Sequence, residues 1–223
     1  MEAVRRAFGA IAGSTRRQPA WPNFAELLGS AAWNRLPAAV RERFPAVHSA
    51  DEYIEYVGTM NEVHATTLGR IVAWLTSVFG TPVATNVGSN VRTVVRVYPN
   101  AKVKGIVWER IYHFAGRSAV TVRSTKRLDR DGGMIEALGR GLRMRLRVSE
   151  HNGTLRFTST GYYLECLGIR MPLPRWLPPG TTHVIHTDEG GGRFRFTMYT
   201  EHPWFGRMFF QEGEFSDAQE RLQ

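Results

Sequence analysis

The sequence predicts a mainly β (α+β) fold, built as a strongly curved antiparallel sheet or barrel of about nine or ten strands. From Val91 onward, apolar and polar residues alternate with a period of two, the pattern of strands that bury one face. In several of these segments the other face is rich in arginine. So many one-sided strands must curl to bury their apolar faces, which favours a barrel over the alternative, a sandwich of two sheets.

The N-terminal part of the chain is expected to be irregular and then helical. Residues 1–22 show no periodicity and predict a flexible leader, followed by a single β-rich domain over 23–216 and a tail over 217–223. Helical spacing of apolar residues predicts two short helices, over 24–28 and 36–44. Both helices precede the first predicted strand.

One strand and one longer helix come next. Period-two alternation predicts a strand over 53–64. After it, an apolar stripe at helical spacing predicts an amphipathic helix over 66–79, which ends at Gly80 with Pro82 beyond. We expect this helix to cap an opening of the barrel.

The remaining strands follow at short intervals. They are predicted over 91–98, 105–115, 118–127, 132–138, 142–149, 155–166, 182–188, 193–201 and 208–215. The clearest pair surrounds the residues His151, Asn152 and Gly153, which are typical of a hairpin turn. Before this turn, an inward apolar set alternates with outward arginines: Leu142, Met144, Leu146 and Val148 against Arg143, Arg145 and Arg147. The proline-rich segment 171–180 is predicted to be a loop.

The composition is that of a folded soluble protein, with 43% hydrophobic and 22% charged residues. No apolar stretch approaches the roughly 20 residues that cross a bilayer as a helix. Cys166 is the only cysteine, so neither an intramolecular disulfide nor a cysteine-based zinc site is expected, and a cytoplasmic location without an export signal is the expectation. The net charge is +9, and all but three of the 29 basic residues are arginine. An anionic partner would explain this bias, and so would a GC-rich genome.

Five segments of the sequence resemble a known family. They are, in chain order, Leu36–Phe44, Tyr56–Met60, Trp108–Arg110, Glu136–Gly139 and Leu167–Pro178. Together they resemble the bacterial domain of unknown function 4166, with similarity from about residue 34 to residue 215. Members of that family look like free-standing proteins or appendages of nicotinamide-dinucleotide-binding domains of the saccharopine-dehydrogenase type, and the resemblance implies no particular activity. Because no Gly-x-Gly-x-x-Gly follows a predicted strand, the chain resembles a stand-alone member without a dinucleotide site.

Arg110, Tyr112 and Glu136 are the candidate catalytic residues. Trp108, Arg110, Tyr112 and Phe114 share one strand parity, so aromatic side chains would surround a guanidinium suited to hold a carboxylate or an enolate. Glu136 lies between apolar neighbours, where desolvation would raise its pKa and Arg110 would lower it. With a raised pKa, Glu136 could act as a general acid or base. The alternative is a buried structural ion pair between Arg110 and Glu136, and both interpretations require the two side chains to be in contact.

Bulky residues on the inward parity of the predicted strands complete the candidate site as ligand-binding residues. They are Trp108, Phe114, Leu142, Met144, Tyr163, Phe194, Phe196 and Met198. No metal site is expected, because His183 and His186 would lie on opposite faces of one strand, and no cofactor is expected. The sequence also lacks a Gly-x-Ser-x-Gly nucleophile elbow, and Cys166 has no histidine near it in the sequence.

Three functions are compatible with these residues. The first is binding of a hydrophobic small molecule, such as a lipid, polyketide or terpenoid, in a β-enclosed cavity beneath the 66–79 helix. The second is a cofactor-independent enzyme, a cyclase or isomerase that acts on such a molecule. The third is a structural module, or a peripheral module that contacts an anionic membrane surface through its outward arginines. Nucleic-acid binding is not expected, because few aromatic residues are interleaved with those arginines, and the sequence does not predict an oligomeric state.

Overall fold

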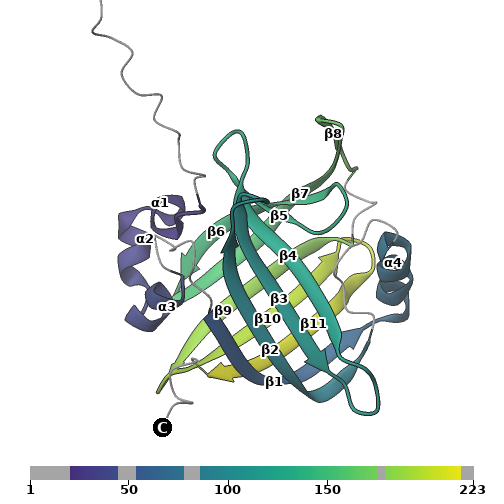
Figure 1. Ribbon diagram of the computed structural model, residues 1–223, viewed down its shortest axis with the longest axis horizontal. Coiled ribbons are helices and arrows are strands. Elements are labelled where there is room, and N and C mark those ends of the chain that lie inside the picture. Colours follow the sequence, from purple (N-terminus) through teal and green to yellow (C-terminus); the bar gives the residue numbers. More distant parts are fainter. Residues whose placement is uncertain (1–20, 45–53, 78–85, 175–178, 217–223) are drawn as a thin grey trace, which may run out of the picture.

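The computed structural model describes residues 21–44, 54–77, 86–174 and 179–216. Its main feature is a closed barrel of ten antiparallel strands, with one further short strand attached outside the ring (Figure 1). The strands are β1 (Ile54–Ala65), β2 (Gly88–Asn100), β3 (Gly105–His113), β4 (Val120–Leu128), β5 (Met134–Ala137), β6 (Leu142–His151), β7 (Thr154–Cys166), β8 (Ile169–Pro172), β9 (Thr181–Gly190), β10 (Arg193–His202) and β11 (Gly206–Ser216). The predicted mainly β fold and its barrel are confirmed.

The strands follow one another around the barrel in chain order, and β11 returns to pair with β1. The extra strand, β8, pairs with β7 alone. Because of this, β7 and β9 share only a short ladder, which joins Leu155–Thr158 to His183–His186. Beyond that ladder β7 turns away to pair with β8, so the two strands separate toward the end of the barrel where β9 begins.

Three short helices cover one end of the barrel. They are α1 (Phe24–Leu28), α2 (Ser30–Arg35) and α3 (Ala38–Arg43), and they contact β6 and β9. The Asn23 side chain caps α1 by accepting hydrogen bonds from two backbone amides, as an N-cap asparagine does. Two ion pairs tie the helices to the strands: Arg35 with Glu150 at 2.6 Å and Arg43 with Asp188 at 2.9 Å.

The fourth helix, α4 (Thr67–Ser77), lies on the opposite side of the molecule, between β1 and β2 in the chain (Figure 1). It packs on β1 and β11, where Ala73 forms a small core with Met208 and Phe209. As predicted, this helix lies at the open end of the strands, and we call this end the α4 end. Within the described residues, no helix has the length and apolar character needed to span a membrane.

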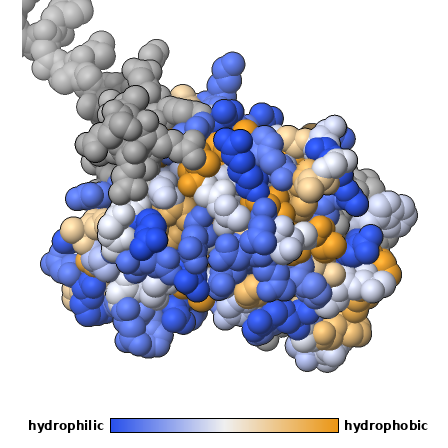
Figure 2. Space-filling model, turned by 90° about the horizontal axis from the view of Figure 1, so that it is seen from below, coloured by the Kyte–Doolittle hydropathy of each residue, from blue (hydrophilic) through white to orange (hydrophobic). Residues whose placement is uncertain are grey.

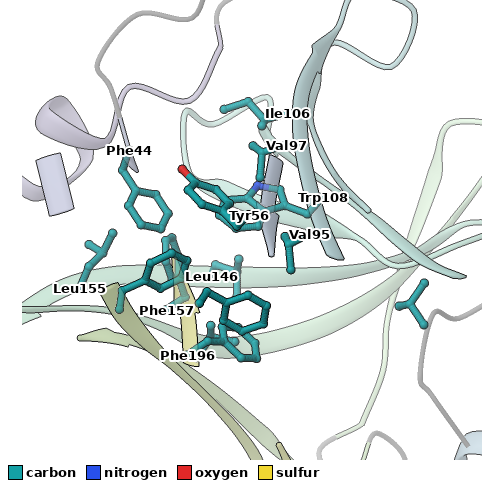
Figure 3. Packing of buried hydrophobic residues seen from close by; sticks show 14 of the residues in the cluster. Phe44, Tyr56, Val95, Val97, Ile106, Trp108, Leu146, Leu155, Phe157 and Phe196 are labelled. Atoms are coloured by element: carbon teal, nitrogen blue, oxygen red, sulfur yellow. The ribbon is translucent and has the colours of Figure 1, made fainter. Parts of the chain in front are cut away.

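The main hydrophobic core fills the half of the barrel next to α1–α3. Figure 3 shows Phe44, which follows α3, among side chains that point inward from the strands. Its ring stacks on that of Trp108 at 5.7 Å and lies 5.8 Å from that of Phe157. Aromatic rings thus close the barrel below the helices.

The β6–β7 hairpin has the predicted register. Leu142, Met144 and Leu146 are buried and Val148 packs against the core, whereas Arg145 and Arg147 are exposed. Arg143, which was also predicted to face solvent, is only partly exposed because it pairs with Glu165. Asn152 and Gly153 form the turn with φ values of 51° and 74°, the left-handed conformation that these two residue types adopt most easily.

The structure differs from the prediction in two elements. Helix α2 has no apolar periodicity and was not predicted, because its residues are largely exposed and leave no stripe in the sequence. The segment predicted as a loop over 171–180 begins with the end of β8, which tolerates Pro172 because it is an edge strand. Most of the predicted leader over 1–22, and the tail over 217–223, lie outside the described residues.

Candidate functional site

A cavity of about 110 Å³ lies inside the barrel toward the α4 end. One part of its wall is apolar and consists of Val122, Leu138, Leu142, Met144, Pro179, Val184, Met198 and Phe209. The other part is polar and consists of Arg110, Tyr112, Ser124, Glu136, Tyr162, Thr182, Thr200 and Gln211. A molecule with an apolar body and a polar group would match both parts.

Strand β3 places two of the polar residues in the cavity. It runs through residues 105–113 in regular pairing with β2 and β4, so alternate side chains point to the same side. Trp108, Arg110 and Tyr112 therefore face inward in a row, from the aromatic core to the cavity. The phenol of Tyr112 donates a hydrogen bond to the side-chain oxygen of Gln211 on β11, at 3.1 Å.

A cluster of three charged side chains lies at the base of the cavity. Lys126 Nζ is 3.2 Å from Glu136 Oε1, and Arg110 Nη2 is 3.9 Å from the same oxygen. Arg110 also donates a hydrogen bond to Ser124 Oγ at 3.4 Å. Below this cluster, the Lys126 ammonium lies 4.8 Å from the ring centre of Trp108, within the range of a cation–π contact.

The pKa shifts of this cluster favour an ionised Glu136 and work against a charged Lys126. Burial alone would raise the pKa of Glu136, but the charges of Lys126 and Arg110, together with hydrogen bonding, bring it below its ordinary value. Burial lowers the pKa of Lys126, and Glu136 opposes that shift. Burial also raises the pKa of Tyr112, so the phenol keeps its proton. At neutral pH the cluster thus holds an ionised carboxylate and a neutral phenol.

Hydrogen bonds close the wall where β7 and β9 separate. Tyr162 on β7 and Thr182 on β9 are joined through their hydroxyl groups at 3.0 Å, and Thr182 is joined to the hydroxyl of Thr200 on β10 at the same distance. The backbone amide of Thr182 donates to Ser159 Oγ at 2.8 Å. Side chains thus replace the missing backbone ladder between these strands.

A second, much smaller cavity of about 20 Å³ lies deeper in the barrel, below Arg110. His186 and Trp108 line it, and neither His186 Nδ1 nor Trp108 Nε1, both buried, has a hydrogen-bond partner among the described residues. Burial lowers the pKa of His186 to about 3, and the nearby charges of Lys126, Arg43 and Arg110 act in the same direction. The imidazole is therefore neutral over the physiological range.

Comparison with known proteins places the chain in a family. A family model matches residues 36–215, and its description is a domain of unknown function, DUF4166. The chain belongs to this family. The resemblance found in the five sequence segments is thereby confirmed. A curated relative, the uncharacterized protein YndH of Bacillus subtilis (strain 168), is 27% identical over 119 residues, which are 52% of this chain and 58% of the relative. No solved structure matches the chain.

Most of the predicted site residues meet at the two cavities. Arg110, Tyr112, Glu136, Leu142, Met144 and Met198 line the larger cavity, and Trp108, Phe194 and Phe196 line the smaller one together with Arg110. The expected contact between Arg110 and Glu136 is present. Phe114 is buried just beyond the end of β3, with its ring 6.0 Å from that of Tyr112, and lines neither cavity.

The structure corrects the placement of Tyr163. Its side chain lies outside the barrel, between the guanidinium groups of Arg145 and Arg170. Uninterrupted alternation from Leu155 predicts an inward Tyr163, but a β-bulge shifts the register of β7 against β6 before this residue. The neighbouring Tyr162 consequently points into the cavity.

Sequence analysis missed several polar residues of the interior, above all Lys126 and His186. The period-two pattern of β4 does place Lys126 on the same side as Val122 and Ser124, which face inward. A lysine is seldom fully buried, so parity alone is a weak reason to place one inside a barrel. Within the described residues, no three His, Cys, Asp or Glu side chains are grouped so that they could hold a metal ion.

Proposed function

We propose that the barrel binds a small organic acid, with its carboxylate against Arg110 and its apolar body against the apolar wall of the cavity. The observation that carries this proposal is the charge cluster at the base of the cavity. When both cations are protonated, Lys126 and Arg110 present two positive charges to one carboxylate, Glu136. A buried charge without a counter-charge is costly, so an anionic ligand would be stabilised there.

Arg110 is the cation that a ligand could reach. Its side chain retains 12% exposure, compared with 4% for Lys126, and it lines the cavity while Lys126 does not. Its distance to Glu136 is also the longer of the two. A guanidinium offers several donors in one plane, which suits a carboxylate.

The cavity volume limits the enclosed part of the ligand. At about 110 Å³, the cavity is smaller than an engineered cavity of roughly 150 Å³ that holds benzene. A short acyl chain or a small ring fits this space. A larger lipid, polyketide or terpenoid would place only its acidic end inside and extend through the α4 end.

The same geometry favours binding over proton transfer. A general acid at neutral pH needs a raised pKa, whereas the pKa of Glu136 is lowered. Lys126 and Arg110 also stabilise the carboxylate form, which weakens it as a base. Arg110, Tyr112 and Glu136 are thus better suited to hold a ligand than to isomerise one.

Calorimetric titration with a matched pair of ligands tests this proposal. Hexanoate and hexanamide have the same chain and differ in charge. We expect wild-type protein to bind hexanoate at least about tenfold more tightly, because a hydrogen bond to a charged group contributes roughly 1.5–3 kcal/mol. Arg110→Met should remove this preference. Arg147→Met, an exposed arginine on the outer face of β6, is the matched control and should keep it.

Equal affinity for hexanoate and hexanamide would contradict the proposal, as would retention of the preference in Arg110→Met. Thermal melts of each variant verify that the barrel is folded before titration. Arg110→Met leaves Glu136 paired with Lys126, so we expect it to fold.

A further inference from the structure

The α4 end of the barrel exposes large hydrophobic side chains. Nine such residues are exposed in the described part of the chain: five lie in connections at this end, and three lie on the β7–β8 hairpin, which leaves the barrel from the same end. The eight, which we call the apolar rim, are Ile71, Trp74, Val87, Leu167, Ile169, Met171, Trp204 and Phe205. The ninth, Val103, lies in the β2–β3 turn at the other end. Single exposed hydrophobic residues are ordinary, but a set gathered at one end indicates an interaction surface.

Helix α4 approaches the barrel through small residues together with Leu68 and Val72, and it exposes two large apolar side chains. An added Cβ at Gly69 would lie 2.5 Å from the carbonyl oxygen of Met208, so the helix approaches β11 closely through this glycine and the buried Ala73. On the other side, Ile71 is 49% and Trp74 is 69% exposed. A surface helix normally turns its largest apolar residues to the core, so the exposure of Ile71 and Trp74 is unusual.

The β7–β8 hairpin presents a similar surface. Leu167 forms its turn with a φ of 49° and is 97% exposed. Leucine in the left-handed region is unfavourable, and asparagine or glycine is the usual choice in such a turn. Ile169 and Met171 continue the exposed apolar row along β8. An exposed leucine held in a strained turn is better explained by a binding role than by stability.

The charges around the apolar rim are positive. The described connections at this end, which cover 66–74, 86–87, 114–119, 138–141, 167–173, 179–180 and 203–205, contain no Asp or Glu. They contain Arg70, Arg117, Arg140 and Arg170. Arg170 pairs with Asp129 and Glu165, whereas Arg70, Arg117 and Arg140 form no ion pair with the described residues. The β4–β5 turn contains Asp129 and Asp131, and Asp129 lies beside the β7–β8 hairpin because it pairs with Arg170 of β8.

We propose that the apolar rim docks onto an anionic lipid bilayer. Aromatic and aliphatic side chains beside unpaired arginines match the two parts of such a surface, its acyl region and its negative headgroups. Figure 2 shows hydrophobic residues among hydrophilic ones on the right of the molecule, the side on which α4 lies in Figure 1. The rim residues come from several separate connections, and a fluid bilayer accepts such scattered anchors without shape complementarity.

This orientation would also turn the ligand cavity toward the membrane. Phe209 lines the cavity and packs against α4, so the cavity and the docking surface share one end of the barrel. An acid partitioned in the bilayer would then reach the cavity without crossing water. The docking surface depends on the rim residues alone and stands without the proposed ligand.

Vesicle flotation with the full chain tests the docking surface. The probes are vesicles of phosphatidylcholine alone and vesicles with 30% phosphatidylglycerol. The salt concentration is held at about 0.1 M throughout, because salt screens charge interactions. We expect wild-type protein to float with the anionic vesicles. Arg70→Glu with Arg140→Glu should reduce the partition coefficient at least about tenfold, because each basic residue near an anionic surface contributes about 1 kcal/mol. Trp204→Ser with Phe205→Ser should reduce it similarly.

The matched controls carry changes of the same kind at the other end of the barrel. Lys102→Glu with Arg130→Glu alters the net charge equally, and Val103→Ser removes the exposed apolar residue there. Both should change partitioning less than about twofold. Wild-type protein that stays with buffer, or controls that lose as much binding as the rim variants, would overturn the proposal. So would a dimer in sedimentation that the rim variants dissociate, since a second copy would then be the occupant. Arg110→Met should float like wild type, which separates this test from that of the ligand.

Discussion

Inside the barrel one carboxylate, Glu136, balances two cationic side chains, Lys126 and Arg110. Loss of the carboxylate should therefore destabilise the protein more than loss of either cation. We expect Glu136→Gln to lower the free energy of unfolding by about 3–5 kcal/mol, because it leaves Lys126 and Arg110 buried without a carboxylate. Lys126→Met leaves Arg110 to balance Glu136 and should cost at most about 2 kcal/mol. Urea denaturation measures both. The opposite order would show that Arg110 does not interact with Glu136.

His186 predicts a pH dependence of stability. Its pKa is about 3 in the folded protein and near 6.5 in the unfolded protein. Between these two pH values the imidazole is protonated in the unfolded state and neutral in the folded state. Stability should therefore fall as the pH decreases from about 6.5, by up to roughly 1.4 kcal/mol per pH unit. His186→Phe, whose ring can keep the stacking on Phe194, should flatten this slope between pH 6.5 and 4.5.

His183 is the control for that measurement. It lies on the outer side of β9, stacked on Tyr199, and partial burial lowers its pKa as well. His183→Gln should remove only a small part of the slope. If the two variants flatten the slope equally, the assignment to His186 is wrong.

Period-two alternation in the sequence correctly predicted which side chains face the barrel interior wherever a strand is regular. Arg110, Tyr112 and Glu136 were predicted from it and line the cavity, because β3 and β5 carry no bulge. Tyr163 was misplaced because a bulge has no signature in a single alternation pattern. Lys126 was missed for a different reason: its burial depends on partners from β3 and β5, which the sequence of β4 alone does not show.

At the scale of elements, the β1–β11 seam closes the barrel through two glycines. A Cβ at Gly58 would lie 2.1 Å from the carbonyl oxygen of Glu214, and one at Gly213 would lie 2.6 Å from Met60 Sδ. We expect Gly58→Ala to destabilise the protein by at least about 1–3 kcal/mol through overpacking at this seam. Gly161→Ala on β7, where no atom lies within 4 Å, is the control and should be neutral or slightly stabilising. Chemical denaturation compares them, and equal effects would mean that the seam is not tightly packed.

Elements with a local signal were predictable, and those defined by distant partners were not. The Asn152–Gly153 turn fixes the β6–β7 hairpin, and the apolar stripe of 66–79 predicts α4, although it does not reveal that large residues of this helix face outward. The pairing of β8 with β7 is what separates β7 from β9 beyond their short ladder. No short-range pattern in the segment 171–180 indicates that pairing.

At the scale of the whole molecule, the two ends of the barrel differ in what covers them. Helices α1–α3 and the aromatic core close one end, and the cavity lies toward the other, beside α4 and the apolar rim. The sequence predicts a curved sheet, because so many one-sided strands must bury their apolar faces. Closure of that sheet depends on the pairing of the first and last strands, which lie about as far apart in the chain as two elements can.

Methionine methyl groups offer the most direct test of the proposed ligand site. Met144 and Met198 line the larger cavity, whereas Met134 and Met208 are buried elsewhere. In protein labelled with ¹³C at its methionine methyls, addition of hexanoate should shift the NMR signals of Met144 and Met198 and leave those of Met134 and Met208 in place. The same addition to Arg110→Met should shift Met144 and Met198 far less at an equal hexanoate concentration. Hexanoate that leaves Met144 and Met198 unchanged in the wild-type protein would contradict a ligand site inside the barrel.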